Sequence, residues 1–140
     1  SVQMKSLFAL GASLFLVACA SSSPPPAVGR YVESVRDFVS VNELHEVDRI
    51  HHQQLTKYLY VNEYFVVMPA GRDHFLIEFR SPCDALRRQQ WTGDMIDIRV
   101  STRVLHADHD TLRGCSIDRI YELSEAQLNE LATLKPVIGA

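Results

Sequence analysis

Two histidines and two aspartates lie close together in the stretch HADHD at 106–110. His106 and His109 are three residues apart, with Asp108 and Asp110 beside them. Imidazole and carboxylate groups bind zinc, copper and nickel, so the stretch is a candidate metal site. The flanking sequence is polar and typical of a loop, and a further ligand would have to come from elsewhere. A solvated polar loop is therefore the alternative interpretation.

A second pair of histidines, His51 and His52, is adjacent in the sequence. Neighbouring side chains point to opposite faces of a strand, and they also diverge on a helix. One ring is expected to pack in the domain while the other is exposed. The pair is a weaker metal candidate for this reason.

Two arginines and the single tryptophan form a candidate interaction group, Arg87, Arg88 and Trp91, in the stretch LRRQQW. The planar guanidinium group matches carboxylate and phosphate groups. Arginine and tryptophan are also enriched among the residues that dominate protein interfaces. The alternative is an exposed helix end whose tryptophan covers the core.

The chain contains no motif that predicts an enzyme. No Gly-x-Ser-x-Gly turn, phosphate loop or dinucleotide-binding motif occurs in the sequence. We therefore expect a non-enzymatic protein without a cofactor. The formal charge is -3, from 14 basic and 17 acidic residues that are interspersed. A nucleic-acid partner is not expected, because such proteins usually carry a basic face.

An apolar run at the N-terminus predicts export. Leu7 to Val17 follows Lys5 and has the length of a signal-peptide core, shorter than the about 20 residues that span a bilayer. The run ends in Leu16-Val17-Ala18-Cys19, which resembles a bacterial lipobox. The resemblance implies a diacylglyceryl group on Cys19 and cleavage before it. Several acyl chains anchor stably, because each buried CH₂ contributes about 0.8 kcal/mol.

The residues after Cys19 predict where the protein is sorted. Cys19 is followed by Ala20, not by the Asp that is associated with retention in the inner membrane. We therefore expect an outer-membrane anchor, a domain that faces the periplasm, and an envelope protein as a further candidate partner. Ser and Pro residues predict an extended linker. The expected organisation is a signal peptide at 1–18, lipidated Cys19 and linker at 19–30, and one domain at 31–140.

Cys83 and Cys115 are the remaining cysteines. In an oxidising periplasm two cysteines most simply pair, so a structural disulfide is predicted. The alternative is a catalytic or redox thiol. Such a thiol usually needs a Cys-x-x-Cys motif or a thiolate-stabilising partner, and neither is visible nearby.

Hydrophobic patterns predict an α+β domain with a small antiparallel sheet, which twist could curl into a partly open barrel. Ser124 and Gln127 form a capping box that starts a C-terminal helix. The other expected elements are a short helix over 32–39, irregular-to-strand structure over 42–50, a strand over 55–69 that Pro69 ends and that a turn at 62–63 could split, a strand over 74–80, a short helix over 81–90 capped by Ser81, a strand over 95–102, a polar loop over 103–114 and a strand over 115–123.

Four stretches together resemble a family of small proteobacterial lipoproteins of unknown function. They are FVSVNELHEVDRI, YLYVNEYFVVM, HFLIEFRSPCDAL and DTLRGCSIDRIYELSEAQLNEL. The family's Cys-x-x-Leu and Cys-x-Ile-x-x-Ile-Tyr elements correspond to Cys83 with Leu86, and to Cys115 with Ile117, Ile120 and Tyr121. Some relatives contain further cysteines, so the resemblance implies only one bridge here. It implies no activity.

Overall fold

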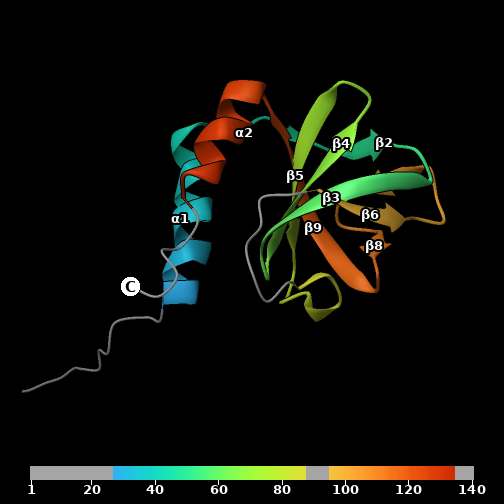
Figure 1. Cartoon of the computed structure of the whole chain (residues 1–140), viewed down its shortest axis with the longest axis horizontal. Coiled ribbons are helices and arrows are strands. Elements are labelled where there is room, and N and C mark those ends of the chain that lie inside the picture. The colour runs from blue at the N-terminus through green and yellow to red at the C-terminus, as the bar shows by residue number, and fades with distance from the viewer. Residues whose placement is uncertain (1–26, 88–94, 135–140) are drawn as a thin grey trace, which may run out of the picture.

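A computed structural model of the chain describes residues 27–87 and 95–134 (Figure 1). The elements, in chain order, are α1 (Ala27–Val41), β1 (Glu46–Val47), β2 (Arg49–His51), β3 (Leu55–Asn62), β4 (Phe65–Ala70), β5 (Asp73–Phe79), a 3₁₀ turn η1 (Asp84–Leu86), β6 (Ile96–Arg99), β7 (Val104–His106), β8 (Thr111–Leu112), β9 (Cys115–Leu123) and α2 (Glu125–Ala132).

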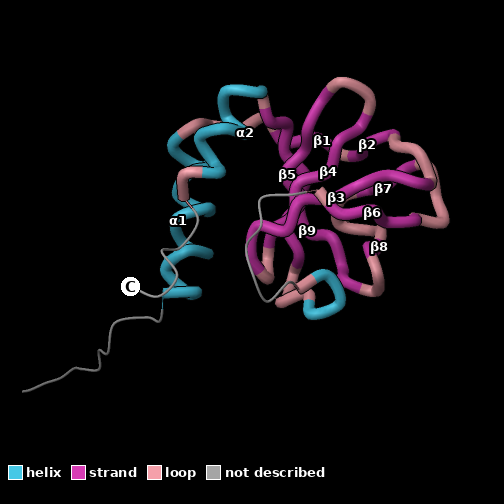
Figure 2. Tube along the Cα trace, viewed as in Figure 1, coloured by secondary structure: helices cyan, strands magenta, loops and turns pink. Residues whose placement is uncertain are grey.

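All strand pairs in the described residues are antiparallel (Figure 2). The main sheet has the order β1-β9-β5-β4-β3-β6, and β8 pairs with β9 outside this path. The β1 and β6 edges do not pair with each other, so the sheet is not closed into a barrel. Strands β2 and β7 form a separate two-stranded ribbon. The predicted α+β class is confirmed.

The central strand β4 is buried on both faces. Four consecutive residues, from Phe65 to Met68, are each 1% exposed or less. Because side chains alternate along a strand, Phe65 and Val67 pack with the helices, whereas Val66 and Met68 enter the other core. The domain therefore has two apolar clusters, one on each face of the sheet.

Helix α1 covers one face of the sheet. Its buried side chains follow helical spacing: they are Tyr31, Val32, Val35 and Phe38. Helix α2 lies on the same side and adds buried Leu131 to this cluster (Figure 1). The predicted capping box is confirmed, because the Ser124 hydroxyl accepts from the Gln127 N–H and the Gln127 side chain accepts from the Ser124 N–H.

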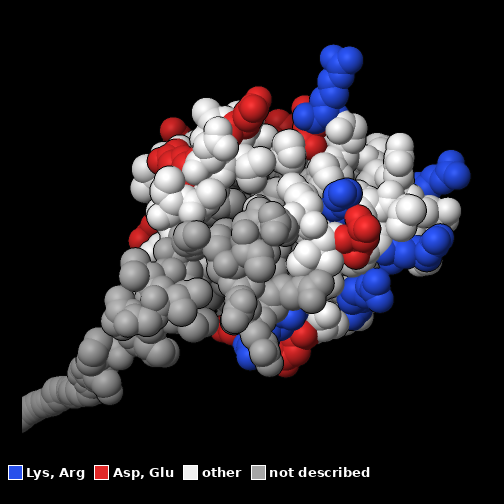
Figure 3. All heavy atoms as spheres, viewed as in Figure 1, with Lys and Arg blue, Asp and Glu red and all other residues white. Residues whose placement is uncertain are grey.

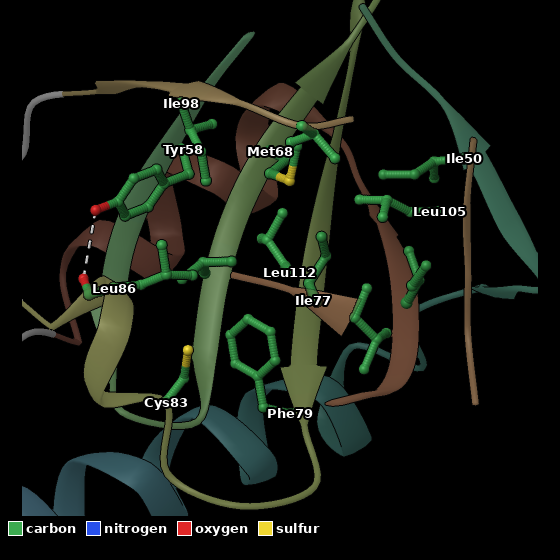
Figure 4. Close-up of a cluster of buried hydrophobic side chains, with 14 residues drawn as sticks. Ile50, Tyr58, Met68, Ile77, Phe79, Cys83, Leu86, Ile98, Leu105 and Leu112 are labelled. Atoms are coloured by element: carbon green, nitrogen blue, oxygen red, sulfur yellow. Dashed lines mark hydrogen bonds between the residues drawn. The ribbon is translucent and has the colours of Figure 1, made fainter. Parts of the chain in front are cut away.

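The other face is covered by short segments rather than by a helix. Ile50 of β2 and Leu105 of β7 point toward Met68 and Ile77 of the sheet (Figure 4). The ribbon thus covers the apolar cluster on this face of the sheet, which we call the inner core. At the opposite side of this core, Leu86 of η1 is 2% exposed and packs in the same cluster.

A disulfide bond joins Cys83, next to η1, to Cys115 at the start of β9, as predicted. The Cys83 N–H also donates to the Glu63 carbonyl oxygen at 2.7 Å. The turn η1 begins at Asp84 with Cys83 at its N-cap, so the prediction that Ser81 caps this helix was wrong. The described helical turn is shorter than the predicted range 81–90, of which residues 88–90 lie outside the described residues.

Two strand predictions also needed correction. The segment 103–114, expected to be a polar loop, contains β7 and β8. These strands have three and two residues, which is too short for alternation to be recognised. Strand β4 continues through Pro69, which pairs with His74 of β5. The pairing of β4 with β3 ends at Val67, so the missing N–H of Pro69 interrupts no pair on that side.

Helix α1 begins at Ala27, inside the segment that was predicted to be linker. The linker was placed by its Ser and Pro content, and that composition ends at Pro26. The split of the first strand run is confirmed, because β3 ends at Asn62 and β4 begins at Phe65. The Asn62 side-chain oxygen accepts from the Tyr64 N–H at 2.8 Å and fixes this turn.

Burial raises the pKa values of Tyr31, Tyr60 and Tyr121. A raised folded-state pKa means that the unfolded chain loses its phenolic protons first, so stability is complete below the ordinary pKa of 10.0 and is lost as the pH rises above it. We expect alkaline unfolding in which tyrosinate absorbance and loss of circular dichroism rise together. Full tyrosine ionisation with unchanged circular dichroism would contradict this.

The disulfide closes a long loop, with a sequence separation of 32 residues. The chain-entropy model assigns such a loop about 3–4 kcal/mol of stabilisation. We expect the Cys83→Ala, Cys115→Ala double variant to lose about this free energy of unfolding in urea titrations. Wild-type protein unfolded with a reductant should match the variant. Equal stability of oxidised wild type and the variant would be the contrary result.

Candidate functional site

The HADHD stretch forms the tight connection between β7 and β8. The Asp110 carboxylate accepts from the His106 N–H at 2.8 Å and contacts His106 Nδ1 at 2.8 Å and His109 Nδ1 at 3.2 Å. These hydrogen bonds, with those to His106 the strongest cause, lower the pKa of Asp110 to about 2. The carboxylate therefore stays ionised and holds the turn and both rings.

The four predicted ligands do not converge. Asp108 has a positive φ of 62° and forms an ion pair with Arg80, away from Asp110. The rings of His106 and His109 lie edge to face, with centroids 6.0 Å apart. Across residues 27–87 and 95–134, no group of three His, Cys, Asp or Glu side chains is placed to hold a metal ion. Metal binding by His106 and His109 stays a prediction.

The adjacent histidines diverge as expected. His51 is exposed on β2, whereas His52 is 7% exposed. The Nδ1 atom of His52 lies 2.7 Å from the Gln53 carbonyl oxygen. The backbone N–H of His52 donates to the Arg103 carbonyl oxygen at 2.9 Å. His52 thus connects the end of β2 to the segment that precedes β7.

Of the predicted interaction group, Arg87 is described, whereas Arg88 and Trp91 lie outside the described residues. Arg87 Nη2 donates to Glu63 Oε2 at 2.8 Å, and its Nε lies 3.6 Å from Asp84 Oδ1. The pKa of Arg87 is raised, first by the neighbouring Tyr60 and then by Asp84. The Arg87 guanidinium is therefore held in place by the fold.

Arg87 lines a cleft of about 250 Å³ between η1, β6 and the turn after β8. Its apolar lining includes Tyr58 of β3 and Leu86 of η1, which are joined by a hydrogen bond from the Tyr58 hydroxyl to the Leu86 carbonyl oxygen at 3.4 Å (Figure 4). Ile96 and Ile98 of β6 complete it. Its other charged side chains are Asp97 and Arg113.

Arg113 and Asp97 were not identified in the sequence as functional candidates. The available signal for Arg113 was its position in the stretch Leu-Arg-Gly-Cys, two residues before Cys115. If Cys115 pairs with Cys83, then residues beside the two cysteines are brought together. Asp97 carried no comparable signal, because it alternates with apolar residues in an ordinary strand pattern.

The Asp110 contacts generate a stability prediction. An Asp110→Ala variant leaves the backbone and ring donors without their acceptor, so we expect a loss of about 1–2 kcal/mol in the free energy of unfolding. Urea titration at neutral pH measures it. His109→Ala is the matched control, because this ring is 81% exposed, and it should change stability by less than about 0.5 kcal/mol. Equal effects of the two variants would contradict the assigned role of Asp110.

Comparison with known proteins gives one positive result. No curated protein and no solved structure matches this chain. Within the described part of the chain, no helix is long and apolar enough to span a membrane. A family model described as a family of unknown function (DUF6491) matches residues 2–135. This range includes the two cysteine elements, at Cys83 and Cys115, that carried the resemblance in the sequence. The chain belongs to this family of unknown function.

Proposed function

We propose that the protein is a lipoprotein anchored through Cys19 in the outer membrane, with a non-catalytic binding or structural domain in the periplasm. The observation that carries the proposal is the Leu-Val-Ala-Cys stretch at 16–19, which ends an apolar run and precedes Ser and Pro residues. The family match begins at residue 2, so this stretch is part of the matched region.

The disulfide supports export independently of the N-terminal stretch. Cys83 and Cys115 are bonded to each other, and disulfides form and persist in oxidising compartments such as the bacterial periplasm. Cys83 is 1% exposed, as expected of a structural bridge rather than an exchanging one. A lipid-anchored periplasmic domain would keep this bond oxidised.

The organisation of the domain supports a binding or structural role. Both cysteines of the domain are used in the bridge, so neither is available as a thiol nucleophile. The ionisable groups around the HADHD turn and Arg87 are engaged in contacts that hold the fold. A domain of this kind would act by contact with an envelope partner or ligand.

Lipidation is tested by a Cys19→Ala variant in cells. The wild type should incorporate labelled palmitate and sediment with membranes. The variant should lose the label, because the thiol that would accept the diacylglyceryl group is absent, and should lose firm membrane association. Ser21→Ala is the control, since it leaves the four lipobox residues intact. Membrane retention of the Cys19→Ala variant would refute the anchor.

Sorting is tested separately with an Ala20→Asp variant. If Ala20 permits transport to the outer membrane, this variant should stay lipidated and move to the inner-membrane fraction of a density gradient. An unchanged distribution would contradict the proposed sorting signal and would leave the lipidation result intact.

A further inference from the structure

The turn that carries Arg113 is unusual for an arginine. Arg113 and Gly114 form the two-residue connection between β8 and β9, with Leu112 paired to Cys115. Both turn residues have positive φ, 54° for Arg113 and 83° for Gly114. Two-residue hairpin turns of this kind favour Asn-Gly or Asp-Gly, because an ordinary side chain is strained at positive φ. Arg113 therefore occupies a position where local turn chemistry prefers Asn.

The Arg113 guanidinium also lacks an ion pair within residues 27–87 and 95–134. Arg87, on another wall of the same cleft, contacts Glu63 and Asp84 instead. The five donors of a guanidinium fit a carboxylate or phosphate group in a forked geometry. Of the two arginines that line the cleft, Arg113 is therefore the one whose guanidinium donors are available to a ligand.

The disulfide fixes the two arginine-bearing walls relative to each other. Cys83 lies four residues before Arg87, and Cys115 lies two residues after Arg113. The two Cα atoms are 5.6 Å apart. The walls are therefore held together covalently, and the ligand would not bear the entropic cost of bringing them together.

The other lining residues define the ligand further. Ala85 and half-buried Ile96 provide the exposed apolar surface beside the two arginines, because Tyr58 and Leu86 are almost fully buried. Asp97 also lines the cleft. Its negative charge is partly balanced by Lys57, whose Nζ lies 3.8 Å from Asp97 Oδ1. A volume of about 250 Å³ is below the about 300–1,000 Å³ that is usual for drug-sized ligands. The cleft therefore suits a small molecule that is recognised mainly through its polar groups.

We propose that this cleft binds a small organic oxyanion, a carboxylate or a phosphate ester, through Arg113, with the rest of the ligand beside Ala85 and Ile96. The proposal rests on the cleft and its turn, and it does not depend on the lipid anchor. Figure 3 shows that Lys and Arg side chains predominate over the strand side of the visible face, with some Asp and Glu side chains among them, and that further Asp and Glu side chains lie near α2.

The test uses the purified full chain in detergent micelles, titrated with benzoate, phenyl phosphate and the neutral benzyl alcohol and followed by amide NMR shifts. Benzoate or phenyl phosphate should give saturable shifts in the residues that line the cleft, and benzyl alcohol should not. Whichever of the two anions binds more tightly distinguishes a carboxylate site from a phosphate site. Equal responses to all three probes, or no response to either acid, would overturn the proposal.

Three variants locate the site. Arg113→Asn should weaken acid binding by about tenfold or more, because a charge-assisted hydrogen bond is lost. It should unfold at the same or a higher urea concentration, because Asn suits the turn. Asp97→Asn should strengthen binding, because it removes a repelling charge. Arg103→Gln is the matched control, an exposed arginine outside the cleft lining.

These variants make the outcome decisive even if one of them misfolds. Circular dichroism and urea titration establish that each variant is folded before binding is measured. Unchanged affinity in folded Arg113→Asn, or an equal loss in Arg103→Gln, would overturn the site assignment. If Arg113→Asn does not fold, weaker binding in Asp97→Asn than in wild type would overturn it.

Discussion

The structure depends on the burial of strand β4 from both sides. Phe65 to Met68 are excluded from water in succession, so each face of the sheet must carry its own cover. Helices α1 and α2 provide the cover on one face. On the other face the cover is assembled from pieces: the β2–β7 ribbon, β8, and the turn η1. Short elements of this kind have little stability of their own and depend on the contacts that fix them.

The disulfide fixes the position of η1, which is too short to be stable by itself. A three-residue 3₁₀ turn cannot hold its position by internal hydrogen bonds, yet Leu86 must stay in the inner core. The Cys83–Cys115 bond ties the turn to β9, and the Cys83 N–H contact with Glu63 ties it to the β3–β4 turn. The same bond brings Arg113 close to Arg87. A requirement of packing therefore also sets the geometry of the cleft.

The sequence was most informative where periodicity was long or a local motif was complete. The start of α2 and the bounds of strand β9 were predicted, because Ser124 and Gln127 form a recognisable pair and apolar side chains recur along the nine residues Cys115–Leu123. Strands β7 and β8 were missed because they are defined by their partners, β2 and β9, rather than by their own pattern. The cleft could not be predicted for the same reason. Its charged lining residues, Arg87, Asp97 and Arg113, meet only through tertiary contacts.

Two arginines illustrate how the fold and a binding site use the same side chain differently. Arg36 of α1 lies 3.1 Å from Glu33 and 3.5 Å from Glu78, and its guanidinium lies 4.9 Å from the centre of the Tyr64 ring. Burial raises the pKa of Glu78 and the Arg36 charge opposes this shift, so the pair orients α1 on the sheet. Arg36 thus contacts Glu33 on its own helix and Glu78 and Tyr64 outside it.

Arg113 differs in its backbone conformation and in its place in the cleft. Arg103 and Arg113 are both exposed, and neither forms an ion pair with another described residue. Arg103 needs no special explanation, since its backbone has no positive φ and surface charge aids solubility. Arg113 has a positive φ, where its side chain adds strain and Asn would add none. Among the described residues it receives no ion pair that would offset this strain. A ligand that binds the guanidinium would offset the backbone strain. The strain and the unused guanidinium donors then have one common explanation.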